Sequence, residues 1–226
     1  MKKYQLLFKI SAVFSYLFFV FGLSQLTLIV QNYWQFSSQI GNLFWIQNIL
    51  SLLFIGVMIV VLVKTGHGYL FRIPRKKWLW YSILTVLVVV FQISFNVQTA
   101  KHVQSTAEGW AVLIGYSGTN FAELGIYIAL FFLVPLMEER GLLQHAFFKH
   151  SRFGLDLLLP SILFALPHFS SLPSLLDIFV FATVGIIFAG LTRYTKSIYP
   201  SYAVHVINNI VAIFPFLLTF LHRVLG

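Results

Sequence analysis

Residues 135–141 read Pro-Leu-Met-Glu-Glu-Arg-Gly and interrupt a stretch of the chain that is otherwise almost entirely apolar. The flanking residues 126–134 and 142–148 carry mostly aliphatic and aromatic side chains. A carboxylate within a hydrocarbon layer is costly, so such residues usually line a wet cavity and have a function. We therefore expect a membrane protein in which other segments supply polar partners to Glu138 and Glu139.

The composition of the whole chain agrees with a membrane protein. Of 226 residues, 59% are hydrophobic and 9% are charged, whereas soluble domains carry about 25% charged residues. We expect a single transmembrane domain over residues 1–226, in a multi-pass protein of the cell membrane. The absence of cysteine excludes disulfides, a thiolate nucleophile and cysteine metal ligands. The net charge of +9 indicates cytoplasmic loops in contact with membrane lipids, and we expect no nucleic-acid partner.

The apolar segments predict an all-α, polytopic transmembrane bundle. A span needs about 20 apolar residues, and about seven segments meet or approach this length: 8–30, 43–63, 78–97, 122–148, 155–170, 174–192 and 198–221. The polar residues 170–174 interrupt the fifth and sixth spans, so the fifth helix is expected to end near mid-membrane. The alternative is a single re-entrant unit in place of these two spans.

The distribution of basic residues predicts a cytoplasmic N-terminus. Eleven Lys and Arg residues then lie on the cytoplasmic side, against only Lys101 and Arg223 on the other. The eleven are Lys2, Lys3, Lys64, Arg72, Arg75, Lys76, Lys77, Lys149, Arg152, Arg193 and Lys196. Merging the fifth and sixth spans weakens this asymmetry, which favours seven. The basic cluster 72–77 is interpreted as a determinant of topology, with a headgroup-binding patch as the alternative.

The first polar group within the spans is Glu138-Glu139-Arg140. Two adjacent carboxylates in a desolvated site cannot both ionise at low cost, which suits a general base. A structural ion pair is the alternative. However, adjacent helical residues point about 100° apart, so Arg140 cannot pair well with Glu139 within the helix.

The second group is Phe164-Ala-Leu-Pro-His168, near the end of the fifth span. Phe164 precedes His168 by one helical turn, where its ring can pack under the imidazole and restrict its rotamers. A lone histidine near a helix end is more often an interface residue than a catalyst, and this reading stays open for His168 alone.

The third group is His205 and Asn209, which are four residues apart and share a helix face. Together they can hold a water or donate to a developing oxyanion; interhelical hydrogen bonding is the alternative. At a rise of about 1.5 Å per residue from the cytoplasmic ends, Glu138 lies roughly 15 Å deep, His168 about 20 Å and His205 about 12 Å. Three helices thus place polar groups in one slab of the membrane, which favours a shared site.

Two reaction schemes use this set of residues. Two histidines and a glutamate could bind Zn²⁺, although no HExxH pair demands a metal. In the scheme that we favour, no cofactor is needed. Glu138 deprotonates a water with help from His168, the hydroxide attacks a peptide carbonyl, and His205 with Asn209 stabilises the oxyanion.

These motifs resemble those of the CPBP family, the CAAX protease and bacteriocin-processing proteins, also called the Abi family. The pattern is Glu-Glu followed by Arg-Gly, then Phe-x-x-x-His, then His-x-x-x-Asn, each in its own late helix. The resemblance covers residues 122–212, whereas residues 1–121 carry no matching motif. It implies an intramembrane endopeptidase, related to the type II prenyl-protein endopeptidases, that cuts a peptide or lipidated-protein substrate. Family members have been described both as metalloproteases and as glutamate proteases.

On this resemblance Glu138 is the base and Glu139 belongs to the catalytic set. His168 orients water, and His205 with Asn209 binds the oxyanion. Arg140 and Phe164 take supporting roles.

The first motif departs from the family pattern. The family has three residues between the second glutamate and the arginine, but Arg140 follows Glu139 directly and Leu143 occupies the expected position. His145 returns to the face of Glu138 but is expected to be an interface residue. The altered spacing favours an alternative function, a non-catalytic member acting in bacteriocin self-immunity. A transporter with a proton-coupling carboxylate pair is a third hypothesis, which the lack of internal repeats disfavours.

Overall fold

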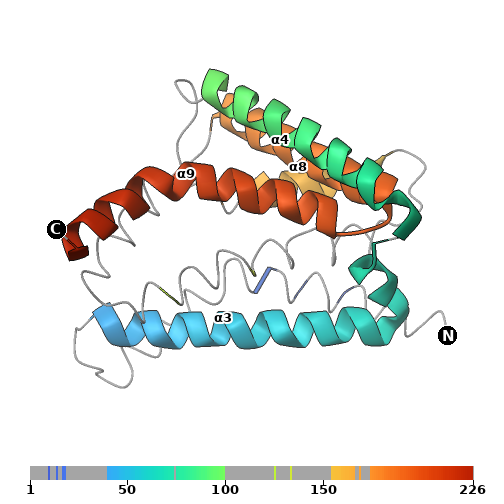
Figure 1. Ribbon diagram of the computed structural model, residues 1–226. Coiled ribbons are helices and arrows are strands. Elements are labelled where there is room, and N and C mark those ends of the chain that lie inside the picture. Colours follow the sequence, from blue (N-terminus) through green and yellow to red (C-terminus); the bar gives the residue numbers. More distant parts are fainter. Residues whose placement is uncertain are drawn as a thin grey trace.

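All the secondary structure in the described part of this computed structural model is helical (Figure 1). The structure describes residues 10, 14, 17–18, 40–73, 75–99, 125, 133, 154–165, 168 and 174–225. The all-α prediction is confirmed for these residues.

In residues 40–99, which the structure describes except for residue 74, two long helices are joined by short helical turns. Helix α3 spans Ile40–Leu62 and continues into the π-helical turn η2, Val63–His67. The chain kinks at Gly66 and changes direction there. The φ of Gly66 is 88°, a value that favours glycine. The 3₁₀ turns η3 (Gly68–Phe71) and η4 (Arg75–Lys77) then lead into α4, Trp78–Thr99.

The described part of the second half, residues 154–165, 168 and 174–225, contains three α-helices. Helix α7 spans Leu155–Ala165, α8 spans Leu175–Thr195 and α9 spans Tyr199–Leu225. Ser174 caps α8 in a reciprocal box with Asp177, so two backbone N–H groups at its start are satisfied within the helix. Lys196 ends α8 in the left-handed conformation, where its N–H donates to the Thr192 carbonyl.

Helix α7 packs on α8, and both α4 and α8 pack on α9. Figure 1 shows α4 and α8 side by side above α9. The core between these helices consists of Phe164, Val184, Phe188, Leu191 and Val204. Residues 84–95 of α4 cover it with partly buried side chains.

Helices α7 and α8 approach each other closely at Gly185. A Cβ on Gly185 would lie 2.8 Å from both Cα and Cβ of Ser161. Small residues permit such close contacts between helices in membranes, where packing replaces the hydrophobic effect as the driving force.

Several contacts bring together one terminus of each of five helices, α3, α4, α7, α8 and α9. Arg193 at the end of α8 donates to Asp156 at the start of α7, with 3.1 Å between Nη1 and Oδ1. The Tyr81 hydroxyl at the start of α4 donates to the Thr195 carbonyl, and the Ile198 N–H before α9 donates to the carbonyl of Leu70, which follows α3. Helices α3 and α8 therefore run toward this end and α4, α7 and α9 run away from it, which is the direction predicted for each of these spans.

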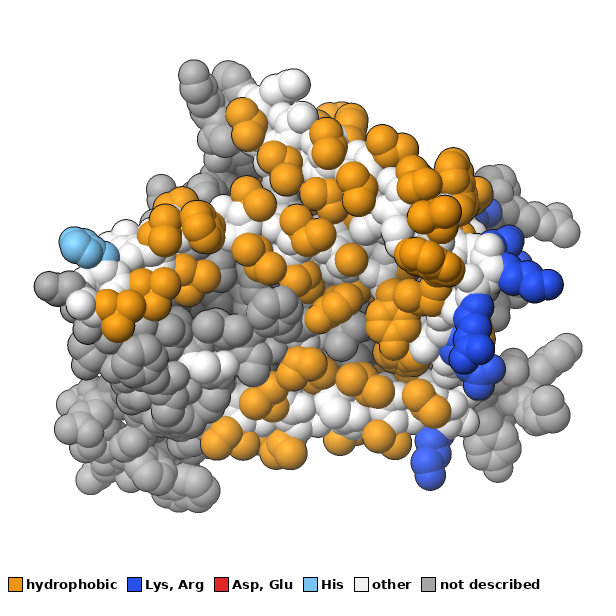
Figure 2. Space-filling model, viewed as in Figure 1, with side chains coloured by type: hydrophobic (Ala, Val, Ile, Leu, Met, Phe, Trp, Pro, Cys, Tyr) orange, Lys and Arg blue, Asp and Glu red, His pale blue; other side chains and the backbone are white. Residues whose placement is uncertain are grey.

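The basic side chains lie at this same end, which we call the basic end. Figure 2 shows the Lys and Arg side chains that the structure describes along one edge of the molecule, at the ends of α3 and α8 and before α4. They are Lys64, Arg72, Arg75, Lys76, Lys77, Arg193 and Lys196. Exposed aromatic residues adjoin them, and the Trp80 indole donates to the Tyr194 hydroxyl over 3.3 Å. Aromatic and basic residues typically occupy a membrane–water interface.

Two of the described helical segments, Arg75–Thr99 and Leu175–Thr195, are long and apolar enough to cross a membrane. Helix α4 exposes apolar side chains such as Val86, Leu87 and Val90, each 60% exposed, as a lipid-facing surface does. These features support a membrane protein. Seven spans and a cytoplasmic N-terminus stay predictions.

The predicted second, third, sixth and seventh spans match α3, α4, α8 and α9 to within four residues. Apart from single residues, the first and fourth lie outside the described residues. The fifth, predicted over 155–170, is described as an α-helix over Leu155–Ala165, or about 16 Å of helix, and residues 166–167 and 169–170 lie outside the described part.

Candidate active site

Four of the seven predicted site residues lie in the described part of the chain: Phe164, His168, His205 and Asn209. Glu138, Glu139 and Arg140 lie outside it. The described four come from α7, from the residues after it, and from α9.

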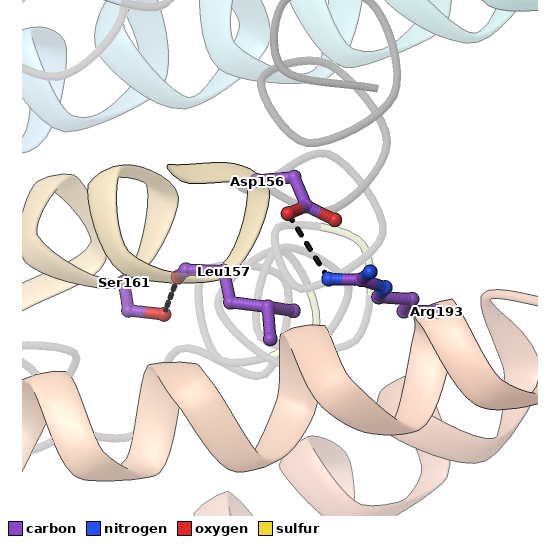
Figure 3. Close-up of polar contacts among 4 residues, drawn as sticks. All are labelled: Asp156, Leu157, Ser161 and Arg193. Atoms are coloured by element: carbon purple, nitrogen blue, oxygen red, sulfur yellow. Dashed lines mark hydrogen bonds and ion pairs between the residues drawn. The ribbon is translucent and has the colours of Figure 1, made fainter. Parts of the chain in front are cut away.

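Figure 3 shows the ion pair that joins the start of α7 to the end of α8, together with a hydrogen bond within α7. Asp156 in its first turn accepts from Arg193, and the Ser161 hydroxyl donates to the Leu157 carbonyl over 2.5 Å. An acidic residue at the start of one helix and a basic residue at the end of the other also suit both helix dipoles. Phe164, in the last turn of α7, is 2% exposed.

His168 lies just beyond α7 and bonds back to it. Its Nδ1 is 2.7 Å from the Phe164 carbonyl oxygen. Because a carbonyl can only accept, Nδ1 carries the proton in this contact. A neutral imidazole in this tautomer has its lone pair on Nε2, the form that accepts a hydrogen bond from water.

The ring of Phe164 is in contact with both histidines. Its centroid lies 4.5 Å from that of His168 and 5.6 Å from that of His205, the latter edge-to-face. The packing of Phe164 on His168, which the four-residue spacing predicted, is therefore present. The structure also brings the second and third sequence motifs together around one aromatic side chain.

Helix α8 supplies the remaining aromatic wall. The Phe188 ring stacks on His205, with centroids 5.1 Å apart, and meets Phe164 edge-on at 6.0 Å. Phe181 lies nearer the start of α8, and its ring centroid is 5.0 Å from that of His168. Sequence reasoning missed both phenylalanines. Their separation by seven residues, or about two turns, puts them on one helix face, but α8 is apolar on every side and its sequence does not mark this face as the one beside the histidines.

His205 and Asn209 lie one turn apart on α9. His205 is 4% exposed, and Asn209 is half-buried. The buried aromatic walls lower the local dielectric and restrict the imidazole rotamers, so hydrogen bonds from these groups act more strongly than in water. The arrangement can orient a water on one side and donate to an oxyanion on the other.

The candidate site residues are compatible with two ways of activating water, with a metal ion or without one. His168 and His205 are two nitrogen ligands of the type that zinc accepts, and a third would have to come from elsewhere. Among the described residues no group of three His, Asp or Glu side chains is placed to hold a metal. Glu138 would be the third member in either scheme.

One polar contact beside the site was also missed. Gln92 and Asn96 on α4 form hydrogen-bonded carboxamides that reach Asn208 on α9. Within the apolar span 78–97 they are four residues apart, which is a visible signal of a polar helix face.

Comparison with known proteins identifies one family. Residues 120–211 match the family described as Rce1-like, the type II CAAX prenyl endopeptidase Rce1-like domain. The match begins within two residues of the resemblance over 122–212 and includes all three sequence motifs. Comparisons with curated proteins and with solved structures gave no match.

Proposed function

We propose that this chain, whose residues 120–211 form a domain of the Rce1-like type II CAAX prenyl endopeptidase family, cleaves a peptide bond of a membrane-associated protein. Members of this family are intramembrane peptidases that act on protein substrates. The observation that carries the proposal for this chain is the pair of histidines held on the ring of Phe164. The substrate that we test is a peptide with a prenylated cysteine, because the family description names that chemistry.

In the proposed reaction, Glu138 accepts a proton from a water that Nε2 of His168 helps to orient. The hydroxide oxygen bonds to the carbonyl carbon, and the developing oxyanion accepts hydrogen bonds from His205 and Asn209. The C–N bond then breaks as Glu138 returns the proton to the leaving nitrogen. Glu139 and Arg140 are assigned to holding Glu138 in place.

The structural support for this scheme is the Nδ1 contact of His168. With the proton on Nδ1, the neutral imidazole carries its lone pair on Nε2, which is the state that the scheme needs in order to receive a hydrogen bond from water. The near-complete burial of His205 supports the oxyanion role, since a donor in a dry site stabilises charge more than one in water.

The test measures cleavage of a fluorogenic peptide that ends in a farnesylated CAAX sequence, with the purified protein in detergent micelles. Glu138→Gln should lower kcat by about 100-fold or more, as loss of a general base does. His205→Gln should lower kcat by about 100-fold through loss of an oxyanion donor. His222→Gln is the matched control, because His222 is exposed on the same helix. Equal rates for the wild type and Glu138→Gln would refute the scheme.

The chelator experiment separates the two ways of activating water. We expect cleavage to persist after dialysis against EDTA and the purified protein to hold no stoichiometric zinc. Loss of activity that Zn²⁺ alone restores would instead assign His168, His205 and Glu138 as metal ligands.

A second function is favoured by one observation, the missing three residues between Glu139 and Arg140. With this spacing the arginine cannot brace the glutamate across one turn. In this alternative the protein is a non-catalytic bacteriocin-immunity factor. Immunity that persists unchanged in Glu138→Gln would support it.

A further inference from the structure

Three carboxamides form a polar ladder between α4 and α9. Gln92 Nε2 donates to Asn96 Oδ1 over 2.9 Å, and Asn96 Nδ2 donates to Asn208 Oδ1 over 2.5 Å. The first two residues belong to α4, which lies outside the family domain at 120–211. The ladder therefore joins a segment without a recognised motif to a helix of the candidate active site.

Gln92, at one end of this ladder, has a polar side chain that is costly to bury. Gln92 is fully buried, and its Oε1 has no hydrogen-bond partner among the described residues. A buried acceptor without a donor destabilises a fold, and a buried polar group within an apolar helix is more often functional than stabilising. Leucine at this position would suit the apolar helix better if the side chain served packing alone.

The ladder meets α9 where apolar packing weakens. Val204 and Val206 are 1% and 7% exposed, whereas Ile207, Ile210 and Val211 are all more than one-third exposed. Among the described apolar side chains that follow Val206 in this part of α9, therefore, burial does little to fix the rotation of the helix. The hydrogen bond to Asn208 supplies a directional contact at this level.

Asn208 shares a turn with the candidate catalytic groups. It follows His205 by three residues and immediately precedes Asn209. A rotation of α9 that moves Asn208 therefore also moves His205 and Asn209. Six residues beyond Asn209, Pro215 lies inside the helix and removes one backbone hydrogen bond, which makes α9 easier to bend there.

We propose that Gln92 and Asn96 are positioning residues that set the rotation of α9 through Asn208. In this role they hold His205 against Phe188 and aim Asn209 at the reacting carbonyl. The proposal rests on the proposed peptidase function for its kinetic consequence, but not for its structural one. Neither residue contacts the substrate.

The kinetic test uses Gln92→Leu and Asn96→Leu with the farnesylated CAAX peptide. We expect kcat to fall about 10-fold or more, since a small misplacement of catalytic groups has large kinetic effects, and KM to change less than about twofold. The melting temperature of Gln92→Leu should stay unchanged or rise, because an unpaired buried oxygen is removed. Gln98→Leu is the control, as Gln98 is an exposed amide on the same helix.

A conservative variant provides the rescue. Asn96→Asp can accept from Gln92 and, with the Asn208 amide turned, from Asn208 as well. It should retain a higher kcat than Asn96→Leu. Equal loss in both variants would contradict a role for the hydrogen bonds.

A second readout does not depend on activity. The Phe188 and Phe164 rings shift the ring proton resonances of His205, which can be assigned through their loss in His205→Gln. In Gln92→Leu and Asn96→Leu we expect these resonances to move toward random-coil positions. The His205 resonances could move in both variants although the wild-type protein cleaves no peptide. That result would refute the proposed function and leave the positioning role supported. Unchanged kcat and unchanged His205 resonances, or a kcat that falls only in step with the melting temperature, would overturn the positioning role.

Discussion

The imidazole of His205 stacks on the phenyl ring of Phe188, with ring centroids 5.1 Å apart and ring planes inclined by 20°. Both side chains are buried, and they come from different helices, α9 and α8. The stacking fixes the plane in which the imidazole can donate. The orientation of a candidate catalytic residue therefore depends on a residue that carries no chemistry itself.

Replacement of Phe188 by leucine should lower activity more than stability. We expect a loss of about 1 kcal/mol of stability from the missing ring contact and a fall in kcat of about 10-fold or more from a less restricted His205. Cleavage kinetics and thermal unfolding measure the two effects. Phe179→Leu on the same helix is the control, because Phe179 is 66% exposed. Equal kcat in the two variants would contradict the orienting role.

The Gly185–Ser161 contact predicts a difference between two glycines of α8. Gly185→Ala should lower the melting temperature, because the new Cβ would meet Ser161 backbone at 2.8 Å and α7 would have to move. Overpacking of this kind typically costs about 1–3 kcal/mol. Gly190→Ala should be neutral or stabilising, since a Cβ there meets nothing within 4 Å. Thermal unfolding in detergent compares the two, and equal melting temperatures would refute the close approach.

The ion pair between Asp156 and Arg193 predicts an asymmetric effect. The Asp156 side chain is 8% exposed, whereas that of Arg193 is 54% exposed. Arg193→Gln leaves a buried carboxylate without this partner and should cost more stability than Asp156→Asn, which removes the buried charge. Thermal unfolding of both variants and of the exposed control Lys196→Gln measures the order. The reverse order would show that the pair contributes little.

The basic end predicts which side of the membrane each helix end faces. Because the chain has no cysteine, single cysteines report without background. Lys76→Cys at the basic end should be labelled by a membrane-impermeant maleimide only after lysis. Leu225→Cys, at the exposed end of α9, should be labelled in intact cells. Labelling of both residues in intact cells would contradict the proposed topology.

The helices were largely predictable from the sequence, because a run of apolar residues of the right length leaves little choice of structure. For the fifth span, predicted over 155–170, the structure describes α7 over Leu155–Ala165, and most of the remaining residues lie outside the described part of the chain. The Phe164–His168 contact was predictable because it depends only on a four-residue spacing.

The aromatic wall on α8 was harder to predict. Phe181 and Phe188 belong to a helix that is apolar on every side, so its sequence does not tell which face meets the histidines. The bond from Asn96 to Asn208 joins residues 112 positions apart, and no local pattern pairs them. The places of Glu138 and Glu139 stay predictions.

The ladder between α4 and α9 also has a consequence for biogenesis. Helices α7, α8 and α9 follow one another in the chain, so the contacts around Phe164 can form as soon as these segments are made. Asn96 is synthesised 112 residues before Asn208. If membrane insertion proceeds along with synthesis, the Asn96 carboxamide on α4 stays in the bilayer without its partner Asn208 until α9 is inserted.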